Sequence, residues 1–186
     1  ADLVAERIQK MVEFLLAVRR PDGTVPQIGD ADGGWLLPLV RRPPEDYCAL
    51  FTLAAALFER PDFAWAARQF APEALWMLGF HGRDAYQALE GAPPADAELT
   101  TFPEGGYVVM RSGWEPGNHQ LILDAGPLGC GVSNGHGHAD LLSIQCSAFG
   151  ENYLVDAGTG CYTAHDDLRN YFRSTRAHST VMVDNL

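Results

Sequence analysis

The sequence predicts an α+β multidomain protein in which a helical half precedes a half built from antiparallel strands. Apolar residues recur at three- and four-residue steps through the first part of the chain, as they do on one face of an amphipathic helix. After a segment rich in Pro and Ala, the pattern changes to short, β-rich runs bounded by glycine, which are typical of strands. We therefore expect helical hairpins at 1–92, a linker at 93–103 and an antiparallel β-sandwich at 104–186.

Several helices are expected in the first half. Residues 2–19 have an apolar face and end at RRPDG, where Pro and Gly stop the helix. A second helix fits 45–59, which opens with acidic residues and ends before Pro61. The segments PDFAWAARQ and PEALWML each begin with a proline, which suits the first position of a helix.

The second half is expected to supply the strands. The segments expected to form them are GYVVMRSGW, HQLILDAG, LLSIQCSAFG, NYLVDAG and HSTVMVDN. A sandwich with so few strands would leave an exposed edge. Because the chain also begins inside a helical pattern, we expect it to be truncated at both ends.

Composition excludes some classes of partner. The net charge of −11 disfavours nucleic acid, since no basic stripe is available to neutralise phosphates. No apolar run reaches the ~20 residues that a membrane span needs. The cysteines Cys48, Cys130, Cys146 and Cys161 form no C-x-x-C pair, which favours reduced, buried thiols over a disulfide framework or a zinc knuckle.

Histidines gather in the second half, and the stretch NGHGHAD holds two of them. In an extended chain alternate side chains share a face, so His136, His138 and Asp140 are expected to point the same way. Zinc binds three or four N, O or S ligands at ~2.0–2.3 Å. His138 could supply one of them, and Asp156 and His178, expected at strand ends, could supply the others.

The spacing alone leaves a structural interpretation open for each of these residues. The two histidines of NGHGHAD suit a polar loop, Asp156 suits a turn that bonds its own backbone, and His178 suits a half-buried position before a strand. Asp30 and Asp32 in IGDADGG lack the length and ligand number of a calcium loop, and a turn between helices is expected there.

Three segments carry a resemblance to a known family. HGHADLLSIQCSAFGENYLVDAGTGCY, RNYFRSTRAHSTVMVDN and the upstream RRPDGTVPQIGDADGG together resemble heparinase II/III-like polysaccharide lyases, in the same order along the chain. The resemblance implies an (α/α) toroid followed by a β-sandwich, with the active site between them. It also implies β-elimination of polysaccharides that contain uronic acid.

Carried over residue by residue, the resemblance implies a zinc ion bound by His138, Asp156 and His178, with His136 in the catalytic site. The family also uses a toroid tyrosine and an Asn-His pair, and nothing before residue 21 matches them. Tyr47 fits a buried helix start instead. We therefore expect half of the active site to lie outside this chain, and the fragment to be inactive alone.

A small basic and aromatic cluster is the candidate for binding an acidic polysaccharide. Arginine forks match carboxylate and sulfate groups. The candidates are Arg169, Tyr171 and Arg173, with Tyr162 nearby. A non-catalytic carbohydrate-binding protein with a structural zinc, and a metal-dependent glycan hydrolase, are the alternatives. A periplasmic or secreted location is expected, and a homodimer is compatible with the sequence.

Overall fold

The computed structural model describes residues 2–31, 37, 39–95, 98–129, 133 and 135–184. Asp32, Cys130 and part of NGHGHAD lie outside these residues. The chain divides into two compact units. The first takes in the described residues of 1–19, 23–25 and 34–96, and the second those of 20–22, 26–33 and 97–186. None of the described helices is long and apolar enough to cross a membrane.

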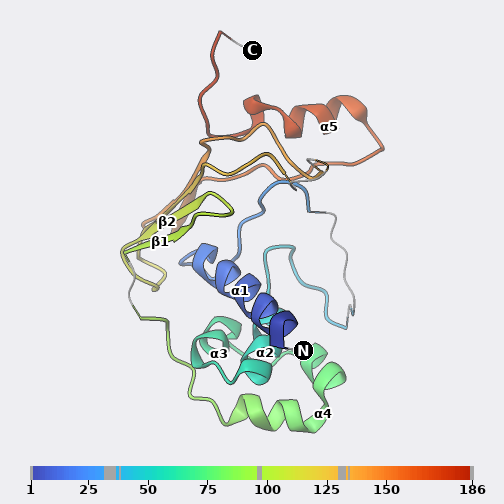
Figure 1. The fold of residues 1–186 in the computed structure, drawn as a ribbon, viewed down its shortest axis with the longest axis vertical. Helices are drawn as coiled ribbons and strands as arrows, with labels where there is room; N and C mark the ends of the chain where they lie inside the picture. The colour runs from blue at the N-terminus through green and yellow to red at the C-terminus, as the bar shows by residue number, and fades with distance from the viewer. Residues whose placement is uncertain are drawn as a thin grey trace. The chain divides into compact units, whose positions relative to one another are not determined.

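The first unit is helical, as expected, and Figure 1 shows its helices in blue to green. They are α1 (Asp2–Val18), α2 (Cys48–Phe58), α3 (Pro61–Ala67) and α4 (Pro72–Gln87). Proline occupies the start of α3 and of α4, where its missing N–H costs nothing. Gly79 breaks the helical backbone of α4 with a φ of 65°, which produces a kink.

The core of this unit is formed by large side chains from α2 and α3 with small ones around them. The Phe51 and Phe63 rings lie 6.5 Å apart and are almost fully buried. Alanines at 54, 55, 66 and 67 let the helices approach closely. A buried ion pair joins Arg42 to Glu73 at 3.3 Å, with both side chains 7% exposed.

The second unit is built on one five-stranded antiparallel sheet in the order β1-β2-β3-β4-β5. The strands are β1 (Leu99–Phe102), β2 (Tyr107–Arg111), β3 (Gln120–Asp124), β4 (Ile144–Ala148) and β5 (Glu151–Leu154). β1 falls inside the segment whose composition predicts a linker. The α+β class is thus confirmed, with an open sheet of the kind a sandwich contains.

The two faces of the sheet differ. Val109 pairs with Ile122 on one face, and both are buried. The same face carries polar groups that find partners: Arg20 donates to the Gln145 amide oxygen at 3.3 Å, and Asn152 donates to Asp22 at 2.9 Å. The opposite face is apolar and less buried, with Met110 41% exposed.

The last part of the unit differs from the expectation. Residues 178–184 contain bends, a turn and residues without regular structure, so the strand predicted for HSTVMVDN is wrong over its described part. The β-branched residues there favour a strand, and the Ile144 N–H of β4 donates to the Ser179 carbonyl at 3.0 Å, but the described residues form no ladder of such bonds here. Before them come α5 (Asp166–Arg173) and the short 3₁₀ helix η1 (Thr175–Ala177), neither of which was predicted.

Candidate metal centre

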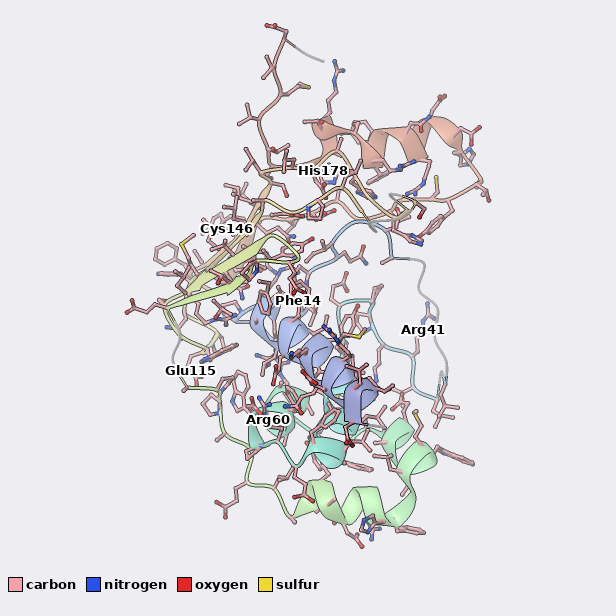
Figure 2. The ribbon with its side chains drawn as sticks, viewed as in Figure 1. Phe14, Arg41, Arg60, Glu115, Cys146 and His178 are labelled. Atoms are coloured by element: carbon pink, nitrogen blue, oxygen red, sulfur yellow. The ribbon has the colours of Figure 1, made fainter. Side chains whose placement is uncertain are left out.

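Three loops of the second unit bring the expected ligand residues together. His138 follows the turn at 135–136, Asp156 lies two residues beyond β5, and His178 follows η1. One ligand atom from each lies within 4.8 Å of the others. Their side chains are almost fully buried, with at most 5% exposed. Figure 2 labels His178 among the loops beside α5.

Hydrogen bonds fix which nitrogen of each imidazole faces the centre. His178 Nδ1 lies 2.8 Å from the Ser174 carbonyl oxygen, which can only accept, so Nδ1 carries the proton. His138 Nε2 lies 2.9 Å from an oxygen of the Asp30 carboxylate and donates to it. Each ring therefore turns an unprotonated nitrogen toward the other.

Those two nitrogens, His138 Nδ1 and His178 Nε2, are only 3.1 Å apart. Two lone pairs facing each other at this distance repel unless a cation, a proton or a metal ion, is shared between them. Asp156 adds a negative charge, with Oδ2 3.8 Å from His178 Nε2, while its Oδ1 accepts from the Gly158 N–H at 2.7 Å. These three residues could together hold a cation.

The donor set fits zinc. Two imidazole nitrogens and one carboxylate oxygen are ligands that zinc takes, and three protein ligands leave a fourth position for water or substrate. Ligands ~2.0–2.1 Å from a tetrahedral ion lie roughly 3.3 Å apart. The separations of 3.1 Å and 3.8 Å fall on either side of that value. The partners of the outer nitrogens orient the rings as metal-binding histidines require.

His136 differs from His138 in its surroundings. Its φ of 62° is left-handed, so the extended chain assumed for this stretch is wrong, although the imidazoles of His136 and His138 both face Asp30. The His136 side chain is 65% exposed, whereas that of His138 is fully buried. Its Nδ1 nevertheless faces Asp30 Oδ2 at 3.4 Å.

Asp30 is the residue of this site that sequence reasoning missed. Its side chain is 1% exposed, and both of its oxygens accept from the guanidinium of Arg169 on α5. The hydrogen bonds from Arg169 hold the pKa of this carboxyl well below its usual range, so it is ionised. The sequence offered only the polar run IGDADGG and its place in a segment that resembles the family, neither of which identifies the partners of Asp30 more than a hundred residues away.

The other expected residues lie around this centre in different ways. Arg173 donates through Nε to the Gly137 carbonyl at 3.3 Å and so supports the histidine loop. The Tyr162 ring lies under the Arg169 guanidinium, 4.8 Å from ring centre to Cζ. Tyr171 is 53% exposed and packs edge-on against Phe172. Burial raises the pKa of Asp140, and the nearby charge of Asp124 adds to the effect.

Comparison with known proteins places this chain in a family. Residues 94–186 match the heparinase II/III-like C-terminal domain, which is half of the chain. The chain therefore belongs to the heparinase II/III-like family. The heparin-sulfate lyase of Pedobacter heparinus is 26% identical over 184 residues, or 97% of this chain and 23% of the relative.

Solved structures show the same fold. A heparinase III, the BT4657 gene product, superposes with a TM-score of 0.68 at 24% identity, over 95% of this chain. The heparan sulfate lyase HepC from Pedobacter heparinus gives 0.67 at 24% identity, over 94% of this chain. In both cases the chain spans 23% of the relative's length.

Proposed function

We propose that this chain carries the metal centre and part of the catalytic site of a lyase that cleaves uronic-acid-containing polysaccharide by β-elimination. The observation that supports it is the exposed imidazole of His136, held beside the buried set of His138, Asp156 and His178. Membership of the heparinase II/III-like family, together with similarity to heparin and heparan sulfate lyases, supports the reaction class.

The reaction needs one proton removed and one returned. A base takes the proton from C5 of the uronate, a C4–C5 double bond forms, and the C4–O4 bond breaks. The leaving O4 then takes a proton and becomes the hydroxyl of the released sugar. Charge builds up on the uronate carboxylate as the C5 proton leaves, so preorganised donors at that group lower the barrier.

His136 is the group in this chain placed to take part. With Nδ1 turned to Asp30, its Nε2 is left to contact the uronate carboxylate or to share in the proton transfer. Zinc bound at His138, Asp156 and His178 would supply a fixed positive charge that organises these loops. The proposed second catalytic group is a toroid tyrosine from outside the chain.

We propose a sulfated glycosaminoglycan of the heparin or heparan sulfate kind as substrate, because the relatives are named for these polymers. The net charge of −11 repels such a polyanion at long range. Arg173, with Tyr162 and Tyr171, remains a candidate for local contact. Both terminal nitrogens of Arg169 donate to Asp30, so any contact with substrate would use the N–H donors that this pair leaves free.

The test uses the intact protein with zinc and a panel of uronans, including heparin, heparan sulfate and alginate. Release of products with the ultraviolet absorption of an unsaturated uronate is the expected result. New reducing ends without that absorption would indicate a hydrolase instead. Saccharide binding without turnover on any of the panel would indicate a non-catalytic carbohydrate-binding protein. The periplasmic or secreted location stays a prediction that cell fractionation tests.

A further inference from the structure

The Asp30 carboxylate is buried where two histidines of one loop and an arginine of α5 meet, all more than a hundred residues further along the chain. Oδ1 accepts from His138 Nε2 at 2.9 Å, Oδ2 faces His136 Nδ1 at 3.4 Å, and Arg169 bonds both oxygens. The backbone adds a further link, since the Asp30 N–H donates to the His136 carbonyl at 3.2 Å. One residue thus touches a metal-ligand candidate and the catalytic candidate together.

The charge of this carboxylate is balanced locally. A carboxylate with 1% of its side chain exposed is costly unless it is paired and hydrogen-bonded. The planar Arg169 fork provides the pairing, and its own side chain is 15% exposed. An ionised carboxylate can only accept, so His138 presents its Nε2–H to Oδ1 at 2.9 Å, while His136 Nδ1 lies 3.4 Å from Oδ2, a contact longer than an ordinary hydrogen bond. Asp30 therefore fixes the tautomer of His138 and keeps Nδ1 of His136 turned inward.

We propose that Asp30 is a positioning residue that orients His138 for the metal and His136 for the substrate through a single carboxylate. Holding the His138 proton on Nε2 leaves Nδ1 as the metal-binding nitrogen. Keeping His136 Nδ1 beside Oδ2 leaves Nε2 as the nitrogen that faces outward. The His136 half rests on the proposed lyase function, whereas the His138 half does not.

The same geometry assigns Arg169 to Asp30. Both terminal nitrogens of its guanidinium bond the two carboxylate oxygens. The Arg169 guanidinium also stacks on the Tyr162 ring, which holds it in place from a second side. Arg169 thus acts on the metal centre indirectly, because it bonds Asp30 and Asp30 bonds the ligand candidate His138.

The test is Asp30→Asn in the intact protein, with zinc alone as the probe. A chelator competition assay is expected to show zinc affinity lowered by roughly 10–100-fold, as for other residues that orient a metal-bound histidine. At saturating zinc, kcat on the cleaved uronan is expected to fall by at least ten-fold, with KM changed by less than three-fold. The matched control is Asp22→Asn, a carboxylate bonded to Asn152 instead, which should bind zinc as the parent does.

Nitrogen NMR gives a readout that a purely structural role would not change. Long-range proton–nitrogen spectra are expected to show His138 protonated on Nε2 in the parent and a mixture of tautomers in Asp30→Asn. If that variant does not fold, Arg169→Lys, which keeps the charge and removes the fork, should weaken zinc in the same direction.

The outcomes separate this proposal from the proposed function. Zinc affinity in Asp30→Asn equal to that of the parent would overturn the role of Asp30, even if activity were lost. A parent protein that binds no zinc would overturn both the metal centre and this role. Normal zinc binding without lyase activity would overturn the proposed function and the His136 half, and the zinc result would still decide the link to His138.

Discussion

His138 and His178 face each other across 3.1 Å with their unprotonated nitrogens, because the other nitrogen of each ring is already committed as a donor. Neither imidazole can relieve the repulsion by turning its proton inward without giving up a bond to Asp30 or to the Ser174 carbonyl. The two nitrogens are therefore placed to share a cation, and the Asp156 carboxylate lies close enough to be a third ligand.

Replacing one of these histidines should abolish tight zinc binding. His178→Ala removes one of three protein ligands, and we expect the zinc dissociation constant to rise by at least 100-fold, beyond the roughly 10–100-fold effect of an orienting residue. Chelator competition on the purified protein measures it. His81→Ala, an exposed histidine on α4, is the control and should leave affinity unchanged. Equal affinity in the two variants would rule out His178 as a ligand.

The sequence predicted the helices well because their signals are local. Apolar spacing indicated α1, and prolines at the first positions indicated α3 and α4. The prediction for 178–184 was wrong because β-branched residues only favour the strand conformation. A strand also needs a neighbouring strand with which to form a ladder of hydrogen bonds. Local preference alone does not settle pairing.

The candidate site was predictable in part. His138, Asp156 and His178 were expected together, and the structure brings them within 4.8 Å, although their metal-binding role stays a prediction. Asp30 could not be found this way. Its role depends on contacts with residues 108 and 139 positions away, and the family resemblance of its segment assigned it no role. The left-handed backbone of His136 could not be predicted either, because the alternation of side chains between two faces assumes an extended chain.

Gly29 is expected to be required where it stands. Its φ is 62°, and a Cβ added there would lie 2.7 Å from the His136 carbonyl oxygen, a backbone atom that cannot move aside cheaply. Gly29→Ala should therefore lower the free energy of unfolding by about 1–3 kcal/mol and weaken zinc binding by displacing Asp30. Gly117→Ala is the matched control, because among the described residues no atom beyond Gly117 and its two chain neighbours lies within 4 Å of the place its new methyl group would take. Urea unfolding of both variants checks this, and equal stabilities would contradict it.

Glu73 and Glu6 should differ sharply in their contribution to stability. Glu73→Ala leaves the Arg42 guanidinium buried with a single remaining carboxylate, Asp46, and should cost about 3 kcal/mol. Glu6→Ala breaks a pair with Lys10 in which both side chains are more than half exposed, so solvent screens the pair and the free energy of unfolding should change little. Thermal or urea unfolding measures both. A small loss at Glu73 would mean that the Arg42 charge is solvated in the folded protein.

Cys48 is expected to react slowly with alkylating agents. Burial raises the pKa of its thiol, and the S–H lies 3.0 Å from the Ala67 carbonyl oxygen, which favours the neutral form. Because the thiolate is the nucleophile, a raised pKa means a smaller reactive fraction near pH 8.

Iodoacetamide labelling of Cys48, followed by mass spectrometry, should therefore be slower in the folded protein than in an unfolded peptide of the same local sequence. The rate should also keep rising with pH above about 9, where an ordinary thiol with a pKa of ~8.5 is already largely ionised. Labelling as fast as in the peptide across this range would show that the thiol is neither buried nor held by its carbonyl partner.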